Sequence, residues 1–102
     1  MGYVYLLCDP IRESYKIGVT RGSIQNRIKK LQTGNATEIH MVKYYQTEYP
    51  FKLEKMLHAK FASKRIMNEW FALDISDITS FTDVCKTTEN DLLYLIEHNP
   101  FM

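Results

Sequence analysis

Several features that assign a function class directly are scarce or missing in this sequence. It has only two cysteines, Cys8 and Cys85, which excludes a disulfide framework, and we expect two buried free thiols. No His/Cys cluster has the spacing of a zinc site, no glycine-rich loop matches a phosphate-binding motif, and no serine stands in a nucleophile-elbow context. Zinc-site, P-loop and α/β-hydrolase chemistry are therefore not indicated.

Long apolar runs are also missing. No run reaches the roughly 18 residues that a membrane span needs, and the start lacks the charged and apolar regions of a secretory signal. There is no internal repeat, low-complexity tract or linker. With 102 residues, 45% of them hydrophobic and 25% charged, the composition is that of one globular domain. We expect a single intracellular domain over residues 1–102, neither secreted nor bound to a membrane.

Acidic residues are absent from one long segment. Between Ser14 and Thr37 there is no acid, and this segment carries five bases: Lys16, Arg21, Arg27, Lys29 and Lys30. Residues 1–65 hold twelve Lys or Arg and five Asp or Glu, a net charge of +7, whereas residues 66–102 hold one and seven, a net charge of −6. This asymmetry favours a half that faces a polyanion and an acidic half. The alternative is that the charges only cover solvated faces.

Aromatic and β-branched residues predict strands over residues 3–8, 15–20 and 39–45, the first two joined as a hairpin. A short extended piece is expected over residues 69–71.

The spacing of apolar residues predicts helices between and after these strands. Ser23 is a plausible cap for a helix whose stripe is Ile24, Ile28 and Leu31, and Gly34 is expected to end that helix in a left-handed conformation. A second helix begins after Pro50, with Leu53, Leu57 and Phe61 on one stripe. The element order is thus β-β-α-β-α, followed by a helical tail.

The tail is predicted to be helical from Ile75 onward. Ile75, Ile78, Phe81 and Cys85 recur on one helical face. Thr88 is a candidate cap for a last helix carrying Leu92, Leu95 and Ile96. One helix and two helices both remain open.

Strand alternation divides the hairpin into two faces. Val4, Leu6, Ile17 and Val19 are expected in one core layer, which places Tyr5 and Lys16 together on the opposite face. A buried tyrosine hydroxyl needs a polar neighbour or water. Tyr5 is therefore a candidate for chemistry, with a structural tyrosine at the sheet margin as the alternative.

Arg27 flanks the apolar stripe of the first helix instead of pointing straight out. A guanidinium held there against the sheet is suited to clamping a phosphate, since it presents several donors in a fixed fork. Lys29 and Lys30 point outward and suit backbone phosphates. A surface ion pair is the alternative for Arg27.

Glu54 and His58 are four residues apart, so both project from one side of the second helix. Glu54 is the only acid between Phe51 and Arg65. A solitary carboxylate among bases suits Mg²⁺ held mostly by water. An exposed helix with ordinary i, i+4 contacts is the alternative.

These pieces together form a known pattern. Tyr3-Val4-Tyr5 stands for a GIY element, and Tyr15-Lys16-Ile17-Gly18 stands for a YIG element. Arg27 follows in a helix, Leu53-Glu54-Lys55 with His58 in a later helix, and Glu69-Trp70-Phe71 after that. The order and spacing resemble the GIY-YIG nuclease superfamily, closest to a branch of phage and large-virus proteins often labelled a DNA-binding domain. The resemblance covers about residues 2–73, and residues 74–102 are expected to form an acidic helical tail packed on this domain.

The resemblance implies an α/β (α+β) fold, with a small three-stranded antiparallel sheet flanked by helices. It also implies an endonuclease that hydrolyses DNA phosphodiester bonds with Mg²⁺ or Mn²⁺. Tyr5 matches the general base, Arg27 matches the arginine that stabilises charge on the phosphate, and Glu54 matches the metal ligand. We further expect contacts to DNA from basic and aromatic residues around this site: Tyr15, Arg21, Lys29, Lys30 and His58.

One departure from the superfamily stands out. Counting back from Gly18, the tyrosine of the second motif falls on position 16, which is Lys16, and Tyr15 lies on the other face of the strand. Either Lys16 takes over the role, by lowering the pKa of Tyr5 or by contacting the phosphate, or this branch works differently. A catalytically inactive DNA-binding module and an interaction protein that uses the acidic tail are the alternative functions. Monomer and homodimer both remain open.

Overall fold

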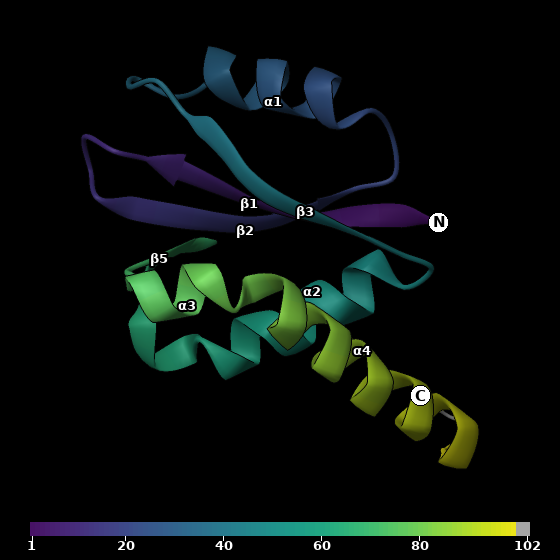
Figure 1. Ribbon diagram of the computed structural model, residues 1–102. Helices are drawn as coiled ribbons and strands as arrows, with labels where there is room; N and C mark the ends of the chain where they lie inside the picture. Colours follow the sequence, from purple (N-terminus) through teal and green to yellow (C-terminus); the bar gives the residue numbers. More distant parts are fainter. Residues whose placement is uncertain (100–102) are drawn as a thin grey trace.

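Helices cover both faces of a five-stranded antiparallel sheet in the computed structural model, which describes residues 1–99 (Figure 1). The sheet order is β3-β1-β2-β5-β4. Helix α1 lies on one face of the sheet, and helices α2, α3 and α4 lie on the other. The elements are β1 Gly2–Asp9, β2 Ser14–Thr20, α1 Ile24–Thr33, β3 His40–Thr47, α2 Pro50–Lys60, a 3₁₀ turn Ala62–Lys64, β4 Arg65–Met67, β5 Trp70–Phe71, α3 Ile75–Thr79 and α4 Phe81–His98.

The α+β class and the antiparallel sheet are confirmed, but the sheet has five strands and not three. The three expected strands are β1, β2 and β3, and the short strands β4 and β5 extend the sheet beyond β2. All three residues of β4 are exposed. Because no side of β4 is buried, it has no alternation of apolar and polar residues, and the pairing of its backbone became visible only in the folded structure.

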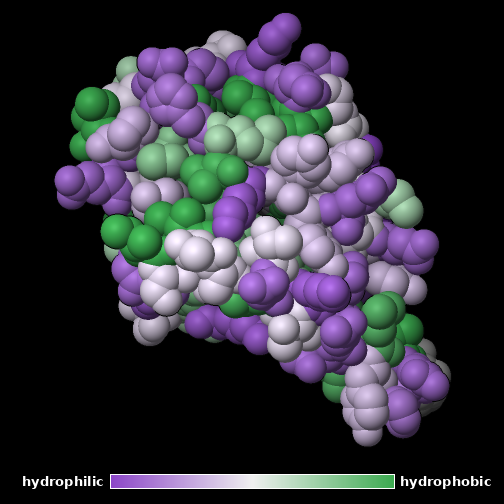
Figure 2. All heavy atoms as spheres, in the orientation of Figure 1, coloured by the Kyte–Doolittle hydropathy of each residue, from purple (hydrophilic) through white to green (hydrophobic). Residues whose placement is uncertain are grey.

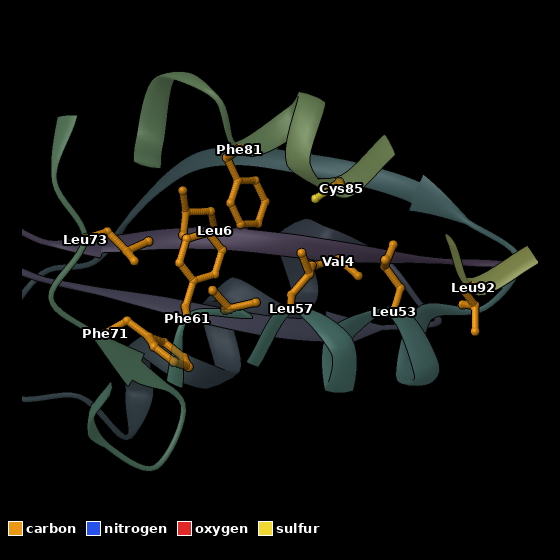
Figure 3. Close-up of a cluster of buried hydrophobic side chains, with 11 residues drawn as sticks. Val4, Leu6, Leu53, Leu57, Phe61, Phe71, Leu73, Phe81, Cys85 and Leu92 are labelled. Atoms are coloured by element: carbon orange, nitrogen blue, oxygen red, sulfur yellow. The ribbon is translucent and has the colours of Figure 1, made fainter. Parts of the chain in front are cut away.

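The register of the hairpin sorts its side chains as alternation predicted. Val4 lies opposite Val19, and Leu6 lies opposite Ile17. Val4, Leu6 and Ile17 belong to the main core, with Val19 packed against it. Figure 3 shows how helices α2 and α4 enclose this layer against the strands. The buried members of the main core are Val4, Leu6, Ile17, Leu53, Leu57, Phe61, Phe71, Leu73, Phe81, Cys85 and Leu92.

A smaller core lies on the opposite face of the sheet, under α1. Its buried members are Tyr5, Leu7 and Ile39, and Ile28 and Leu31 of α1 pack against them. The predicted stripe of α1 is thereby confirmed. Since Tyr5 belongs to this smaller core, its hydroxyl lies on the side of the sheet that faces α1.

The ends of the first helix follow the sequence in part. The Ser23 hydroxyl accepts a hydrogen bond from the backbone N–H of Asn26 at 3.3 Å, so the predicted cap is confirmed. The expectation for Gly34 is wrong, because its φ is −91° and not left-handed. The N–H of Gly34 bonds to the Leu31 carbonyl instead, which closes the last turn tightly without a left-handed residue.

The tail forms two helices, and its longer helix is part of the main core. Phe81, Cys85 and Leu92 of α4 are fully buried there. The helix continues through Thr87 and Thr88 without the break that Thr88 suggested. Ile75 is 81% exposed and does not join the predicted face, because it lies in the separate short helix α3.

Two polar contacts attach the tail to β3. The Tyr45 hydroxyl donates to Glu89 at 2.8 Å, and burial together with this carboxylate raises the pKa of Tyr45 to about 12. Lys43 donates to the carbonyls of Ile78 and Thr79 at 2.8 Å and 3.0 Å, where α3 ends. These contacts, together with the buried residues of α4, attach residues 75–98 to the sheet. Cys8 and Cys85 are free thiols, of which only Cys85 is fully buried.

The molecule is elongated, with extents of 44 × 28 × 21 Å along its principal axes. The C-terminal end of α4 extends beyond the sheet and the other helices (Figure 1). Hydrophobic side chains gather on this end (Figure 2), where Leu93, Tyr94 and Leu95 are exposed. Within residues 1–99, none of the helices combines the length and the hydrophobicity needed to span a membrane.

Candidate active site

A cleft lies beside the part of the β2 edge that β5 does not cover. β5 pairs with β2 only at Tyr15 and Lys16, so the remainder of this edge has no strand beside it. Helices α1 and α2, from opposite faces of the sheet, both reach this edge. The cleft has a volume of about 360 Å³ and is lined by Val19, Thr20, Arg27, Phe51, Glu54 and Glu69.

Tyr5 and Arg27 are joined at the cleft. The Nε–H of Arg27 donates to the Tyr5 hydroxyl at 3.4 Å, a long hydrogen bond. Tyr5 is 1% exposed, and its ring crosses the strand at Gly18, which lies opposite it in the register. A Cβ on Gly18 would lie 2.5 Å from Tyr5 Cζ, so only glycine at this position leaves room for the ring.

The electrostatics of Tyr5 differ from the expectation. Burial raises the pKa of the Tyr5 phenol, and the hydrogen bond and positive charge of Arg27 offset this only in part. Lys16 was one candidate for lowering this pKa, but its ammonium is paired elsewhere. Tyr5 is therefore a neutral phenol at neutral pH in this arrangement.

Lys16 forms an ion pair with Glu69. Its Nζ lies 2.8 Å from the Glu69 carboxylate and 5.6 Å from the centre of the Trp70 ring. The Lys16 side chain is 14% exposed. Lys16 is thus on the same face as Tyr5, as alternation predicted, with its charge directed to Glu69.

Glu54 and His58 reach the same edge of β2 from α2. The His58 Nε2 lies 2.8 Å from the Ile17 carbonyl, and because a carbonyl only accepts, Nε2 carries the proton. Burial and the neighbouring Glu69 carboxylate raise the pKa of Glu54, against the charges of His58, Lys16 and Arg27. The Glu54 side chain is half-buried and lines the cleft.

The donor set at this point suits a divalent cation. Ligand atoms of Glu54, His58 and Glu69 all lie within 4.8 Å of one another. Carboxylate oxygens are preferred by Mg²⁺ and Mn²⁺, and an imidazole nitrogen is accepted more readily by Mn²⁺. The residues present therefore fit the metal that the motif resemblance implies.

The other predicted contact residues are distributed unevenly. Arg21 lies with its guanidinium carbon 5.3 Å from the centre of the Phe51 ring, beside the cleft. Lys30 lines two further hollows along α1, and Lys29 is exposed on the same helix. Tyr15 is not brought to the site, because it packs against the main core on the other face of the sheet.

Glu69 lines the site, although the sequence analysis gave it no role beyond membership of the Glu69-Trp70-Phe71 segment. It lies in the turn between β4 and β5, after Asn68, whose φ is 53°. Its carbonyl accepts from the N–H of Ile17 at 3.2 Å, which ties the turn to β2. Fourteen residues of helix, turn and strand lie between Glu54 and Glu69, and no periodicity relates positions across such a segment.

Comparisons with known proteins place the chain in a family. No curated protein and no solved structure matches it. One family model, that of the T5orf172 domain, matches residues 2–86. The matched segment includes the whole sheet, helices α1 to α3, the first part of α4 and every residue that lines the cleft. The chain therefore belongs to the T5orf172 domain family.

Proposed function

We propose that this protein is a metal-dependent endonuclease that hydrolyses DNA phosphodiester bonds. The observation that supports this most directly is the meeting of Tyr5, Arg27 and Glu54 at one edge of the sheet. Arg27 and Glu54 line the same cleft, and Arg27 is hydrogen-bonded to Tyr5. The T5orf172 domain is phage-associated and related to nuclease-like folds, and the motif order resembles that of GIY-YIG nucleases.

The three side chains have complementary tasks in phosphodiester cleavage. Arg27 gives its Nε–H to Tyr5, which leaves its two terminal nitrogens to bind phosphate oxygens and to stabilise charge as it develops there. To the Tyr5 hydroxyl, which is buried and hydrogen-bonded to Arg27, we assign the task of positioning the attacking water and accepting its proton. Its raised pKa keeps the phenol protonated, and only the phenolate accepts a proton, so this task requires further positive charge in the cleft to lower the pKa of Tyr5.

Glu54 and its neighbours His58 and Glu69 would hold the divalent cation. Such a cation supplies Lewis-acid stabilisation to the phosphate and positive charge to the cleft when it is bound. Arg21 and Lys30, on either side, are suited to the flanking backbone phosphates.

Nicking of supercoiled plasmid in Mg²⁺, Mn²⁺ or chelator tests the proposal. We expect nicking with either metal and none with chelator. Glu54→Gln and Arg27→Ala should lower the rate by roughly two to three orders of magnitude, as removal of a group that stabilises transition-state charge does elsewhere. Tyr5→Phe retains the buried ring and should also abolish nicking, since it removes only the hydroxyl.

Asp91→Asn, an exposed carboxylate of α4, is the matched control and should nick like the parent protein. Melting temperatures of all variants show whether loss of activity reflects loss of fold. If the protein retards DNA in a gel but nicks it with neither metal, the result would support a DNA-binding module instead of an enzyme. If the protein neither binds nor nicks DNA, the remaining hypothesis is an interaction protein.

A further inference from the structure

Glu69 and Lys16 form a pair at two positions to which the motif resemblance assigns no defined role. Position 16 carries a lysine in place of the second-motif tyrosine. The Lys16 ammonium is 2.8 Å from the Glu69 carboxylate. The Ile17 N–H donates to the Glu69 carbonyl, which ties the turn that carries Glu69 to β2. This backbone hydrogen bond holds Glu69 at the cleft.

We propose, on the basis of the proposed function, that Glu69 is a second carboxylate ligand of the cation held by Glu54, and that Lys16 is a built-in competitor for this site. The ligand atoms of Glu54, His58 and Glu69 lie within 4.8 Å of one another. On an octahedral Mg²⁺ or Mn²⁺, metal–oxygen distances near 2.1 Å place opposite ligands about 4.2 Å apart and neighbouring ligands about 3.0 Å apart. Small side-chain movements therefore bring all three onto one ion.

The hydrogen bond of His58 decides which of its ring nitrogens can bind a metal. Nε2 donates to the Ile17 carbonyl, so Nδ1 is the nitrogen with a free lone pair. A histidine that ligates a metal commonly gives its other N–H to a backbone carbonyl, which fixes the orientation of the ring. His58 is also held edge-on against Phe71, with 5.1 Å between the ring centres. One nitrogen and two carboxylates favour Mn²⁺ over Mg²⁺.

The charge balance explains the role given to Lys16. Glu54 and Glu69 bring two negative charges together, and Lys16 already neutralises Glu69. A cation that binds both carboxylates must share Glu69 with this ammonium or displace it. Lys16 therefore weakens metal binding in the free protein.

Mn²⁺ binding to the full chain, measured by the electron paramagnetic resonance of unbound Mn²⁺ and by calorimetry, tests this without any substrate. We expect one site in the parent protein. Glu54→Gln and Glu69→Gln should each weaken it at least tenfold, as loss of a ligand-shell group does. Lys16→Met should tighten it roughly fivefold, the scale of one partly exposed ion pair. Asp91→Asn should bind like the parent protein, and thermal unfolding should show that all variants are folded.

Unchanged Mn²⁺ affinity in Glu69→Gln, or no Mn²⁺ site in the parent protein, would overturn the assignment. Unchanged or weaker binding by Lys16→Met would overturn the role of Lys16. The plasmid assay separates these failures from that of the proposed function. If the protein binds Mn²⁺ as described but never nicks DNA, the metal site is supported and the nuclease function is rejected. If Glu69→Gln still nicks DNA, the nuclease function is supported and the role of Glu69 as a second ligand is rejected.

Discussion

At the scale of single residues, the most consequential side chain outside the cleft is Asp9. It is fully buried at the end of β1. Its carboxylate accepts hydrogen bonds from the hydroxyl of Thr37, the amide of Asn35 at 3.3 Å and the backbone N–H of Arg12 at 3.2 Å. Asp9 therefore joins the hairpin turn to the loop between α1 and β3, and it helps to set where α1 lies on the sheet.

Asp9→Asn should destabilise the fold by roughly 1–3 kcal/mol at pH 7, because an amide group then faces donors that need an acceptor. The hydrogen bonds from Thr37 and Arg12 lower the pKa of Asp9 in the folded state despite its burial. Its contribution is therefore present above the unfolded value of about 3.9 and is lost as the pH falls through the lower folded pKa. Urea unfolding at pH 7 and pH 3 should show that the difference between parent and variant shrinks in acid. An equal difference at both values would contradict this linkage.

At the scale of elements, α4 belongs to the domain and is not an appendage. The resemblance in sequence stopped near residue 73, yet Phe81, Cys85 and Leu92 fill the main core (Figure 3). The match to the T5orf172 family likewise continues to residue 86. No residue of α3 or α4 is among those that line the cleft, so the tail supports the site through α2 and the sheet.

A chain that ends at Asp74 should fail to fold cooperatively. Loss of Phe81 alone corresponds to roughly 3–5 kcal/mol, a large part of the 5–15 kcal/mol that is typical of a domain. A chain that ends at Leu93 keeps every buried residue of α4, loses only the partly buried Ile96 from the main core, and should still melt cooperatively. Circular dichroism melts of both chains distinguish these cases. A cooperative transition in the shorter chain would show that α4 is dispensable for folding.

At the scale of the whole molecule, the basic helix α1 and the acidic helices α3 and α4 lie on opposite faces of the sheet, whereas the lysines of α2 share the face of α3 and α4 (Figure 1). Arg21, Arg27 and Lys30 are close in sequence and border the cleft or the hollows beside it, and Lys29 is exposed on the same helix as Arg27 and Lys30. A DNA backbone approaching the cleft meets positive charge first.

Binding of a short duplex in chelator should therefore weaken steeply with salt. Four phosphate contacts correspond to a slope of about −3.6 in a plot of log affinity against log salt concentration. The double variant Lys29→Gln with Lys30→Gln should reduce this slope by about 2. Lys86→Gln, the same change at an exposed position of α4, should leave it unaltered. Fluorescence anisotropy at several salt concentrations provides the slope, and an unaltered slope in the double variant would count against this surface.

Much of the fold was determined by the sequence itself, because the features concerned are local. Alternation placed Val4 and Ile17 in one layer and Tyr5 and Lys16 on the other face, and helical spacing placed the stripes of α1 and α2. These patterns arise from the fixed periods of strands and helices. These periodic patterns located the strands and helices that form the cleft. The order of the motifs indicated that Tyr5, Arg27 and Glu54 are the candidate functional side chains.

The tertiary structure alone decided which charges meet. That Lys16 pairs with Glu69, and that Glu69 stands beside Glu54, depends on a two-strand extension whose exposed β4 carries no hydrophobic pattern. The burial of Asp9 depends on a loop nearly thirty residues away. Contacts of this kind are set by how elements pack and by backbone hydrogen bonds between distant segments, and neither leaves a period in the sequence.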